Sequence, residues 1–359
     1  MEEKLISKKK PAYPINDELY SYLTDYNRNI KIPIFYEDLL RFDGAIVVYD
    51  KKGEDSLWVR VYYSEHERDE IDLSLKQMYM ILHGDGTEDS LPYLTVDAID
   101  YCTFGNSKPF RVKIRNILND NYSYIYVKIA DASRVYGLEL EHILSPNNIN
   151  FLIYRDTLIE EHVLGVPGDV FLEDILPTVS EQGRKKISKE FVKFNERCMI
   201  RLLGDMRAYN FVIVASYDFD QVEYRIRAMD FDQQSYEGNL KVYFPQFFKD
   251  NYPFVKMVSE CLQEESIEQY KKEERSAIAR RIKGDHERIH DLLNCMIKDK
   301  ISTSEKVKQL KTDLFKYTKD VKFKRSNNMG DILKVGFDFV VRNYENVNTY
   351  LLKGKREIK

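Results

Sequence analysis

The chain has 359 residues, of which 43% are hydrophobic and 32% are charged, and its formal net charge is -4. This length has room for two or three packed units, and the composition is typical of a soluble globular protein. The weakly negative charge gives no reason to expect nucleic acid as a partner, because phosphate binding needs clustered Lys and Arg. No apolar run approaches the roughly 18 residues that span a bilayer, so we expect no membrane interaction.

The cysteines and the N-terminal residues indicate the compartment. Four cysteines are scattered at positions 102, 198, 261 and 295, and no two have the Cys-x-x-Cys spacing. Scattered thiols in a long chain are typical of packing residues in a reducing compartment. Residues 1–10 are charged and are not followed by the apolar segment of a secretion signal. We therefore expect a cytoplasmic protein.

The first quarter of the chain predicts a small unit ahead of the main body. Residues 1–30 are polar and Tyr-rich and are expected to form an irregular arm. The β-branched and aromatic runs Gly44–Asp50 and Ser56–Tyr63 predict a hairpin. Glu65–His83 has apolar residues at helical spacing. Residues 1–93 are accordingly predicted to form an arm and a small α/β extension.

From residue 94 onward, strands come first and helices follow. The predicted strands are Val96–Phe104, Pro109–Asn116, Tyr122–Ile129, Asn150–Arg155 and Thr157–Val163, with a helix at Arg134–Leu144. After Gly165–Gly168 the chain is mainly helical, apart from a hairpin at Phe211–Tyr217 and Val222–Met229. Such segregation predicts an α+β fold with two lobes, at 94–164 and 165–359, and argues against a doubly wound parallel sheet.

Three polar residues flank the second hairpin. Asp205 and Asn210 are five residues apart just before it, and Asp230 directly follows its return strand. Because a hairpin brings its two ends together, Asn210 and Asp230 should lie side by side. Carboxylate and amide oxygens suit Mg²⁺, which phosphoryl transfer requires against the nucleotide phosphates. An Asp-x-x-x-x-Asn spacing alone is common, so its meaning depends on the ordered set of motifs around it.

That ordered set resembles the protein-kinase-like superfamily. Asp205-x-x-x-x-Asn210 is similar to the catalytic loop, and Asp230-Phe231-Asp232 to the metal-binding Asp-Phe-Gly segment. The Gly204-Asp205 pair is closer to aminoglycoside phosphotransferases and bacterial toxin kinases than to eukaryotic protein kinases. The resemblance implies a two-lobed fold and a phosphotransferase that uses ATP and Mg²⁺.

The resemblance also implies roles for these residues. Asp205 would be the catalytic base, and Asn210 and Asp230 would be Mg²⁺ ligands. Arg207, two residues after Asp205, would contact phosphate. Asp232 replaces the usual glycine and is a candidate for an additional metal ligand.

Further nucleotide-binding residues are implied upstream. Lys128 in Tyr126-Val127-Lys128-Ile129 would hold the α- and β-phosphates, and Glu139 or Glu141 on the following helix would pair with it, Glu139 being favoured. Backbone groups of Glu160, Glu161 and His162 would meet the adenine. The expected phosphate-covering loop, 103–108, has a single glycine, Gly105.

Three departures or extra motifs leave alternatives open. The glycine-poor loop motivates a pseudokinase that presents a surface to a partner, and Leu203 replaces the usual histidine. Transfer of AMP instead of phosphate is a second alternative. His286-Glu287-Arg288-Ile289-His290 matches a zinc-hydrolase pattern, with Glu305 as a possible third ligand. No pattern identifies the acceptor, which would be a hydroxyl of a protein or of a small molecule.

Overall fold

The computed structural model describes residues 10–50, 52–84, 88–104, 107–218 and 221–344. The protein is α+β, as predicted, and divides into two compact units. Pro14–Ala132 and Ile149–His162 form the sheet unit, and Ser133–Asn148 with the described residues from Val163 onward and 10–13 form the helical unit. Among these residues, none of the helices combines the length and apolarity needed to cross a membrane.

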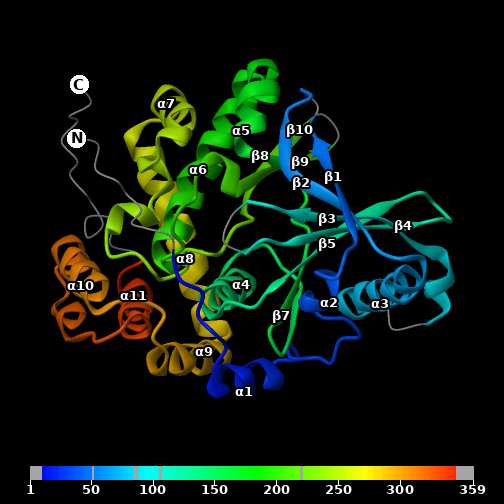
Figure 1. Ribbon diagram of the computed structural model, residues 1–359. Coiled ribbons are helices and arrows are strands. Elements are labelled where there is room, and N and C mark those ends of the chain that lie inside the picture. Colours follow the sequence, from blue (N-terminus) through cyan, green and yellow to red (C-terminus); the bar gives the residue numbers. More distant parts are fainter. Residues whose placement is uncertain (1–9, 51, 85–87, 105–106, 219–220, 345–359) are drawn as a thin grey trace. The chain divides into compact units, whose positions relative to one another are not determined.

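The sheet unit is built on one antiparallel sheet of seven strands in the order β1-β2-β3-β4-β5-β7-β6 (Figure 1). Its strands are β1 (Gly44–Tyr49), β2 (Asp55–Tyr62), β3 (Leu94–Cys102), β4 (Phe110–Asn116), β5 (Tyr122–Ile129), β6 (Phe151–Tyr154) and β7 (Thr157–Glu161). Each consecutive pair along the chain from β1 to β5 is antiparallel. Alternate residues of β4, among them Phe110, Val112 and Ile114, are buried, so one face of the sheet carries the core.

The α-helices among this unit's described residues are α1 (Asp17–Asp25), α2 (Tyr36–Leu39) and α3 (Glu65–His83). α3 occupies the predicted residues, and its Ile71, Leu75 and Met78 are buried in the same apolar cluster as the core side of the sheet. The Ser64 hydroxyl caps its N-terminus and Gly84, at φ 70°, ends it. The predicted hairpin of β1 and β2 is confirmed by their pairing.

Two expectations for the N-terminal residues were wrong. Residues 1–30 were expected to be irregular, but α1 forms there, capped by the Asn16 side chain, and buries Leu19, Tyr22 and Leu23. Three apolar residues in one short helix are too few to show the helical spacing of apolar residues in the sequence. The expected boundary at residue 93 is also not a division of the structure, because β2 pairs with β3 through Trp58 and Cys102 and extends the same sheet.

The helical unit contains most of the helices. They are α4 (Ala132–Leu144, in this unit from Ser133), α5 (Gly168–Val170), α6 (Glu181–Arg201), α7 (Tyr252–Cys261), α8 (Glu264–Gly284), α9 (His286–Lys298), α10 (Ser304–Thr318) and α11 (Met329–Asn343). A small sheet has the order β10-β9-β8, formed by β8 (Val166–Pro167), β9 (Phe211–Asp218) and β10 (Gln221–Ala228). Thirteen residues of α6 are buried, so this helix runs through the unit's interior (Figure 1).

Helix α4 departs from the expected domain division. It was assigned with the strands to residues 94–164, but from Ser133 it belongs to the helical unit. Buried ion pairs explain this placement: Glu139 accepts two hydrogen bonds from Arg288 of α9, at 2.7 and 2.9 Å, and Glu141 pairs with Arg201 of α6. Both glutamates are at most 3% exposed, so breaking either pair would leave a buried charge.

Candidate functional site

The Asp205 loop begins where α6 ends. Leu202, with φ 55°, turns the chain out of the helix. The chain then runs beside the segment that follows Asp230: Gly204 N donates to Gln233 O at 3.2 Å, and Ser235 N to Leu202 O at 2.8 Å. A Cβ at Gly204 would lie 2.8 Å from Val242 Cγ1 and 3.2 Å from Gln233 O, so only glycine allows this approach.

Asp205 has an unusual backbone conformation, with φ 59°. Its carbonyl oxygen accepts hydrogen bonds from Arg207 N at 2.8 Å and from Asn210 Nδ2 at 2.7 Å. Its side chain is 21% exposed. Left-handed conformations of non-glycine residues cluster at functional sites, and this one is held in place by the bonds around it.

The hairpin of β9 and β10 returns Asp230 to Asn210. Ala228 pairs with Phe211, and Met229 N donates to Asn210 O at 3.1 Å. The predicted hairpin is therefore confirmed, and the residues on either side of it lie next to each other. This is the local geometry on which the sequence-based hypothesis depended.

The electrostatics link Asp205 to its neighbours. The pKa of Asp205 is raised to about 6, because burial and the nearby negative charges of Asp230 and Asp250 outweigh the lowering effect of Arg207. Asp205 is therefore still ionised at neutral pH, but it is a stronger base than an ordinary aspartate. These are the properties expected of a general base.

Two arginines each hold two of the acids. Arg207 Nε lies 2.9 Å from Asp205 Oδ1, and its Nη1 lies 3.3 Å from Asp250 Oδ2. Arg134 Nη1 lies 2.9 Å from Asp230 Oδ1 and 2.7 Å from Asp232 Oδ1. Sequence reasoning identified neither Arg134 nor Asp250, since neither lies in a recognisable motif.

The side chains at the hairpin's base fit a magnesium ion by their chemistry. The side-chain nitrogen Nδ2 of Asn210 donates to Asp205 O, so the side-chain oxygen of Asn210 is not used in that bond. Asp230 is 34% and Asp232 21% exposed, so a ligand can reach them. Within the described ranges no group of three or more His, Cys, Asp or Glu is arranged to hold a metal. Mg²⁺ is commonly held by one or two protein carboxylates together with water and substrate phosphates, and Asp230 and Asp232 provide two carboxylates.

The remaining predicted nucleotide-binding residues belong to the sheet unit. Lys128 Nζ of β5 lies 2.8 Å from Glu160 Oε2 of β7, and both side chains are buried. Glu161 N donates to Asn150 O at 3.0 Å and His162 N to Tyr124 O at 3.1 Å. An adenine contact through these two N–H groups would have to replace bonds that the sheet already makes.

Lys128, Glu139 and Glu141 have well-defined partners within their own units. Lys128 pairs with Glu160, whereas Glu139 and Glu141 pair with arginines of the helical unit. The predicted pairing of Lys128 with Glu139 or Glu141 would join the two units and stays a prediction. Gly105, the glycine of the expected phosphate loop, lies outside the described residues.

His286 and His290 lie on successive turns at the start of α9, with stacked rings 6.2 Å apart. His290 Nδ1 lies 3.1 Å from Asn294 Nδ2 and 3.5 Å from Asp291 Oδ1. Glu305, suggested as a third ligand, is at the start of α10. The described part of the chain does not gather these three into a possible metal site.

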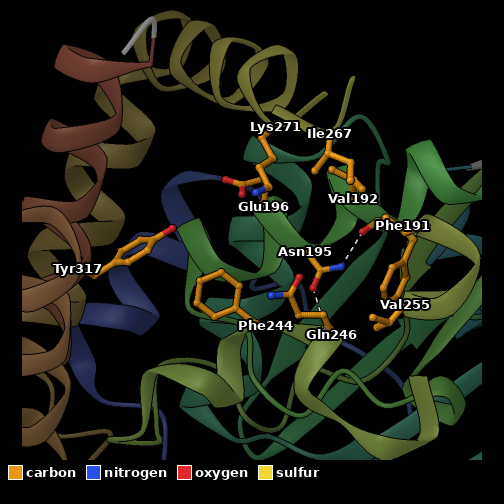
Figure 2. A pocket seen from close by; sticks show the side chains of 11 residues that line it. Phe191, Val192, Asn195, Glu196, Phe244, Gln246, Val255, Ile267, Lys271 and Tyr317 are labelled. Carbon is orange, nitrogen blue, oxygen red and sulfur yellow. Dashed lines mark hydrogen bonds between the residues drawn. The ribbon is translucent and has the colours of Figure 1, made fainter. Parts of the chain in front are cut away.

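A separate cavity of about 180 Å³ lies in the helical unit (Figure 2). Apolar side chains of α6, α7 and α8 dominate its walls, and Asn195 is fixed there by bonds to Phe191 O, at 2.7 Å, and from Gln246 N, at 2.9 Å. Asn251 connects this wall to the Asp205 loop, because its Nδ2 donates to both Pro245 O and Met206 O at 2.7 Å. The cavity thus adjoins a segment that supports the loop, while the site acids do not line it.

Comparison of the sequence with known protein families finds no match, and a search of curated proteins finds no similar sequence.

Proposed function

We propose that the protein is an ATP- and Mg²⁺-dependent phosphotransferase of the protein-kinase-like class, acting on a hydroxyl of a protein or a small molecule. One observation carries the proposal: the hairpin returns Asp230 to Asn210, beside a partly exposed Asp205 whose pKa is raised to about 6. The order of motifs in the sequence supports the same class. A two-lobed arrangement in which Lys128 binds the phosphates and a cytoplasmic location are parts of this proposal.

In the proposed reaction, Asp205 accepts the proton of the acceptor hydroxyl. The hydroxyl oxygen forms a bond to the γ-phosphorus, the bond from that phosphorus to the bridging oxygen breaks, and ADP leaves with the bond's electrons. Asn210 holds the Asp205 main chain, so the base is fixed before the acceptor arrives. Arg207 orients the Asp205 carboxylate, and in the proposed reaction it would also contact the transferred phosphate. Asn210 and Asp230, with Asp232, would hold Mg²⁺, which neutralises phosphate charge when bound.

The second candidate function is a pseudokinase that presents a surface to a partner and transfers no phosphate. Arg134 supports it, since this arginine already neutralises Asp230 and Asp232. The sheet bonds made by the N–H groups of Glu161 and His162 support it as well. The first observation concerns the binding of the metal, and the second concerns the binding of the adenine.

Analysis of the products from ATP tests the proposal. The wild-type protein, incubated with Mg²⁺ and ATP, should form ADP, with water or its own side chains as acceptor in the absence of the natural one. Asp205→Ala should lower this rate by about 10²- to 10⁴-fold while still binding the non-hydrolysable analogue AMP-PNP. Asp218→Ala, which removes an exposed acid at the hairpin's far end, is the matched control and should keep the rate.

Each other product pattern points to a different conclusion. Formation of AMP and a protein mass increased by AMP would indicate AMP transfer. Absence of ADP formation in a folded protein, above all together with absence of AMP-PNP binding, would indicate the pseudokinase. An Asp205→Ala protein with the wild-type rate would show that Asp205 is not the base.

A further inference from the structure

Helix α4 contacts the segment 230–234 at three positions along its first turns. Ser133 Oγ donates to Gln234 O at 2.6 Å. Arg134 Nη1 bonds both Asp230 and Asp232. A Cβ on Gly137 would lie 3.0 Å from Phe231 Cβ, so the helix and the segment are packed as closely there as glycine allows. These contacts leave the segment little freedom to move against the helix.

The same helix is fixed to the rest of the helical unit by its other face and its later turns. Tyr136 Oη donates to Asp299 Oδ2 at 3.0 Å, and Tyr136 is fully buried. Glu139 and Glu141 form the buried pairs with Arg288 and Arg201 described above. α4 is therefore a rigid support, and not a loosely attached element, for the 230–234 segment.

We propose that Arg134 is a positioning residue for the metal-binding carboxylates, holding Asp230 and Asp232 so that both face one Mg²⁺·nucleotide. This inference rests on the proposed function. A single nitrogen, Nη1, bonds Oδ1 of both aspartates, and Asp230 Oδ1 also accepts from Asp232 N at 3.1 Å. These bonds fix the rotation of each carboxylate and their relative placement before the metal arrives.

Two effects of Arg134 oppose each other. Its positive charge repels a metal ion, so removing it should by that effect tighten metal binding. Its hydrogen bonds hold the negatively charged carboxylates of Asp230 and Asp232 close together, whereas without Arg134 their mutual repulsion would move them apart. We expect the second effect to dominate, because Arg134 is only 3% exposed and is fixed by a helix that is itself anchored. Removing residues that orient metal ligands typically weakens metal affinity by about 10- to 100-fold.

Calorimetric titration of binding, without turnover, tests this inference. The quantity measured is the Mg²⁺ concentration at half-maximal binding of AMP-PNP. Arg134→Met should raise this Mg²⁺ concentration by about tenfold or more. Arg134→Lys keeps the charge but not the planar donor group, so it should raise the Mg²⁺ concentration less. Arg225→Met removes a positive charge from an exposed position of β10 and should leave it unchanged.

A second variant covers the case in which Arg134→Met fails to fold. Gly137→Ala keeps every charge, but its Cβ would lie 3.0 Å from Phe231 Cβ and so displaces the 231–234 segment slightly from α4, which should also raise the Mg²⁺ requirement. The inference is overturned if Arg134→Met needs no more Mg²⁺ than the wild type. If Arg134→Met does not fold, the inference is overturned when both Gly137→Ala and Arg134→Lys need no more Mg²⁺ than the wild type. Either outcome leaves the proposed function standing. Absence of Mg²⁺-dependent AMP-PNP binding in the wild type overturns the proposed function itself.

Discussion

Two groups of acids in the helical unit meet arginines in different ways. Glu139 and Glu141 are at most 3% exposed, and Arg201, the partner of Glu141, is 1% exposed. Asp205 and Asp230 also contact arginines, yet 21% and 34% of their side chains are exposed. An acid that is both paired and fully enclosed can only support the fold, whereas a paired acid that remains accessible can also contact a ligand. Accessibility, more than residue type, therefore separates the structural acids from the candidate catalytic ones.

The buried pair of Glu141 and Arg201 offers the largest effect on stability. Arg201→Met should lower the free energy of unfolding by about 3–5 kcal/mol, because it leaves the Glu141 carboxylate without its counter-charge in the interior. Turnover per folded molecule should stay near the wild-type value. Urea denaturation measures the first quantity, and activity normalised to folded protein measures the second.

The double variant Glu141→Leu with Arg201→Met is the control for that experiment. Because it removes both charges, it should recover most of the lost stability. If Arg201→Met instead abolished turnover in a well-folded protein, the division between structural and catalytic acids would be wrong.

Asn251 supports the site without belonging to it, so an intermediate effect is expected. Its side chain is fully buried, and its Nδ2 donates to Met206 O and Pro245 O. Asn251→Ala should reduce stability by about 1–3 kcal/mol, because two buried carbonyl oxygens lose their donor. Turnover should fall as well, since the loop that carries Asp205 loses a support. A stability loss without any change in turnover would show that the loop is held by its other bonds alone.

The pH dependence of the two groups of acids should differ in sign. Burial raises the pKa of Asp205 to about 6, so turnover should fall about tenfold per pH unit below that value, where the base becomes protonated. Its raised pKa also means that the folded state binds this proton more tightly than the unfolded state. Stability from this group should therefore decrease as pH rises from about 4 to about 6.

Glu141 should behave in the opposite way. Burial alone would raise its pKa, but Arg201 and other partners hold it below the usual value. It therefore stabilises the fold above the pKa of an unfolded glutamate, and this contribution is lost as pH falls toward its folded value. Urea denaturation of Asp205→Asn at pH 5 and pH 8, and of Glu141→Gln at pH 3 and pH 5, each compared with the wild type, measures both. If the free energy of unfolding changed with pH in the same way in both variants, the predicted difference between the two groups of acids would be wrong.

The sequence was informative where local patterns determine structure. Helix α3 and strand β5 occupy the predicted residues, and the hairpin at 211–229 differs from its prediction only at its ends. Asp205, Asn210 and Asp230 could be selected because the hairpin between them is a local element.

What the sequence could not determine depends on contacts between distant residues. The ion pair of Lys128 and Glu160 follows from the pairing of β5 with β7, and helical spacing on α4 contains no information about it. Arg134 was missed for the same reason, since its aspartates are about a hundred residues away. The addition of β1 and β2 to the main sheet likewise depends on a pairing with β3 that no turn signal specifies.

The most direct test compares one acid from each group by calorimetric titration with Mg²⁺ and AMP-PNP. Asp230→Asn should abolish Mg²⁺-dependent binding and change the melting temperature little. Glu139→Gln should lower the melting temperature, because Arg288 loses its charged partner, and should weaken the binding far less than Asp230→Asn does, because Tyr136 and Glu141 still anchor α4. The opposite pattern, with binding kept in Asp230→Asn and lost in a folded Glu139→Gln protein, would contradict the assignment of the metal site.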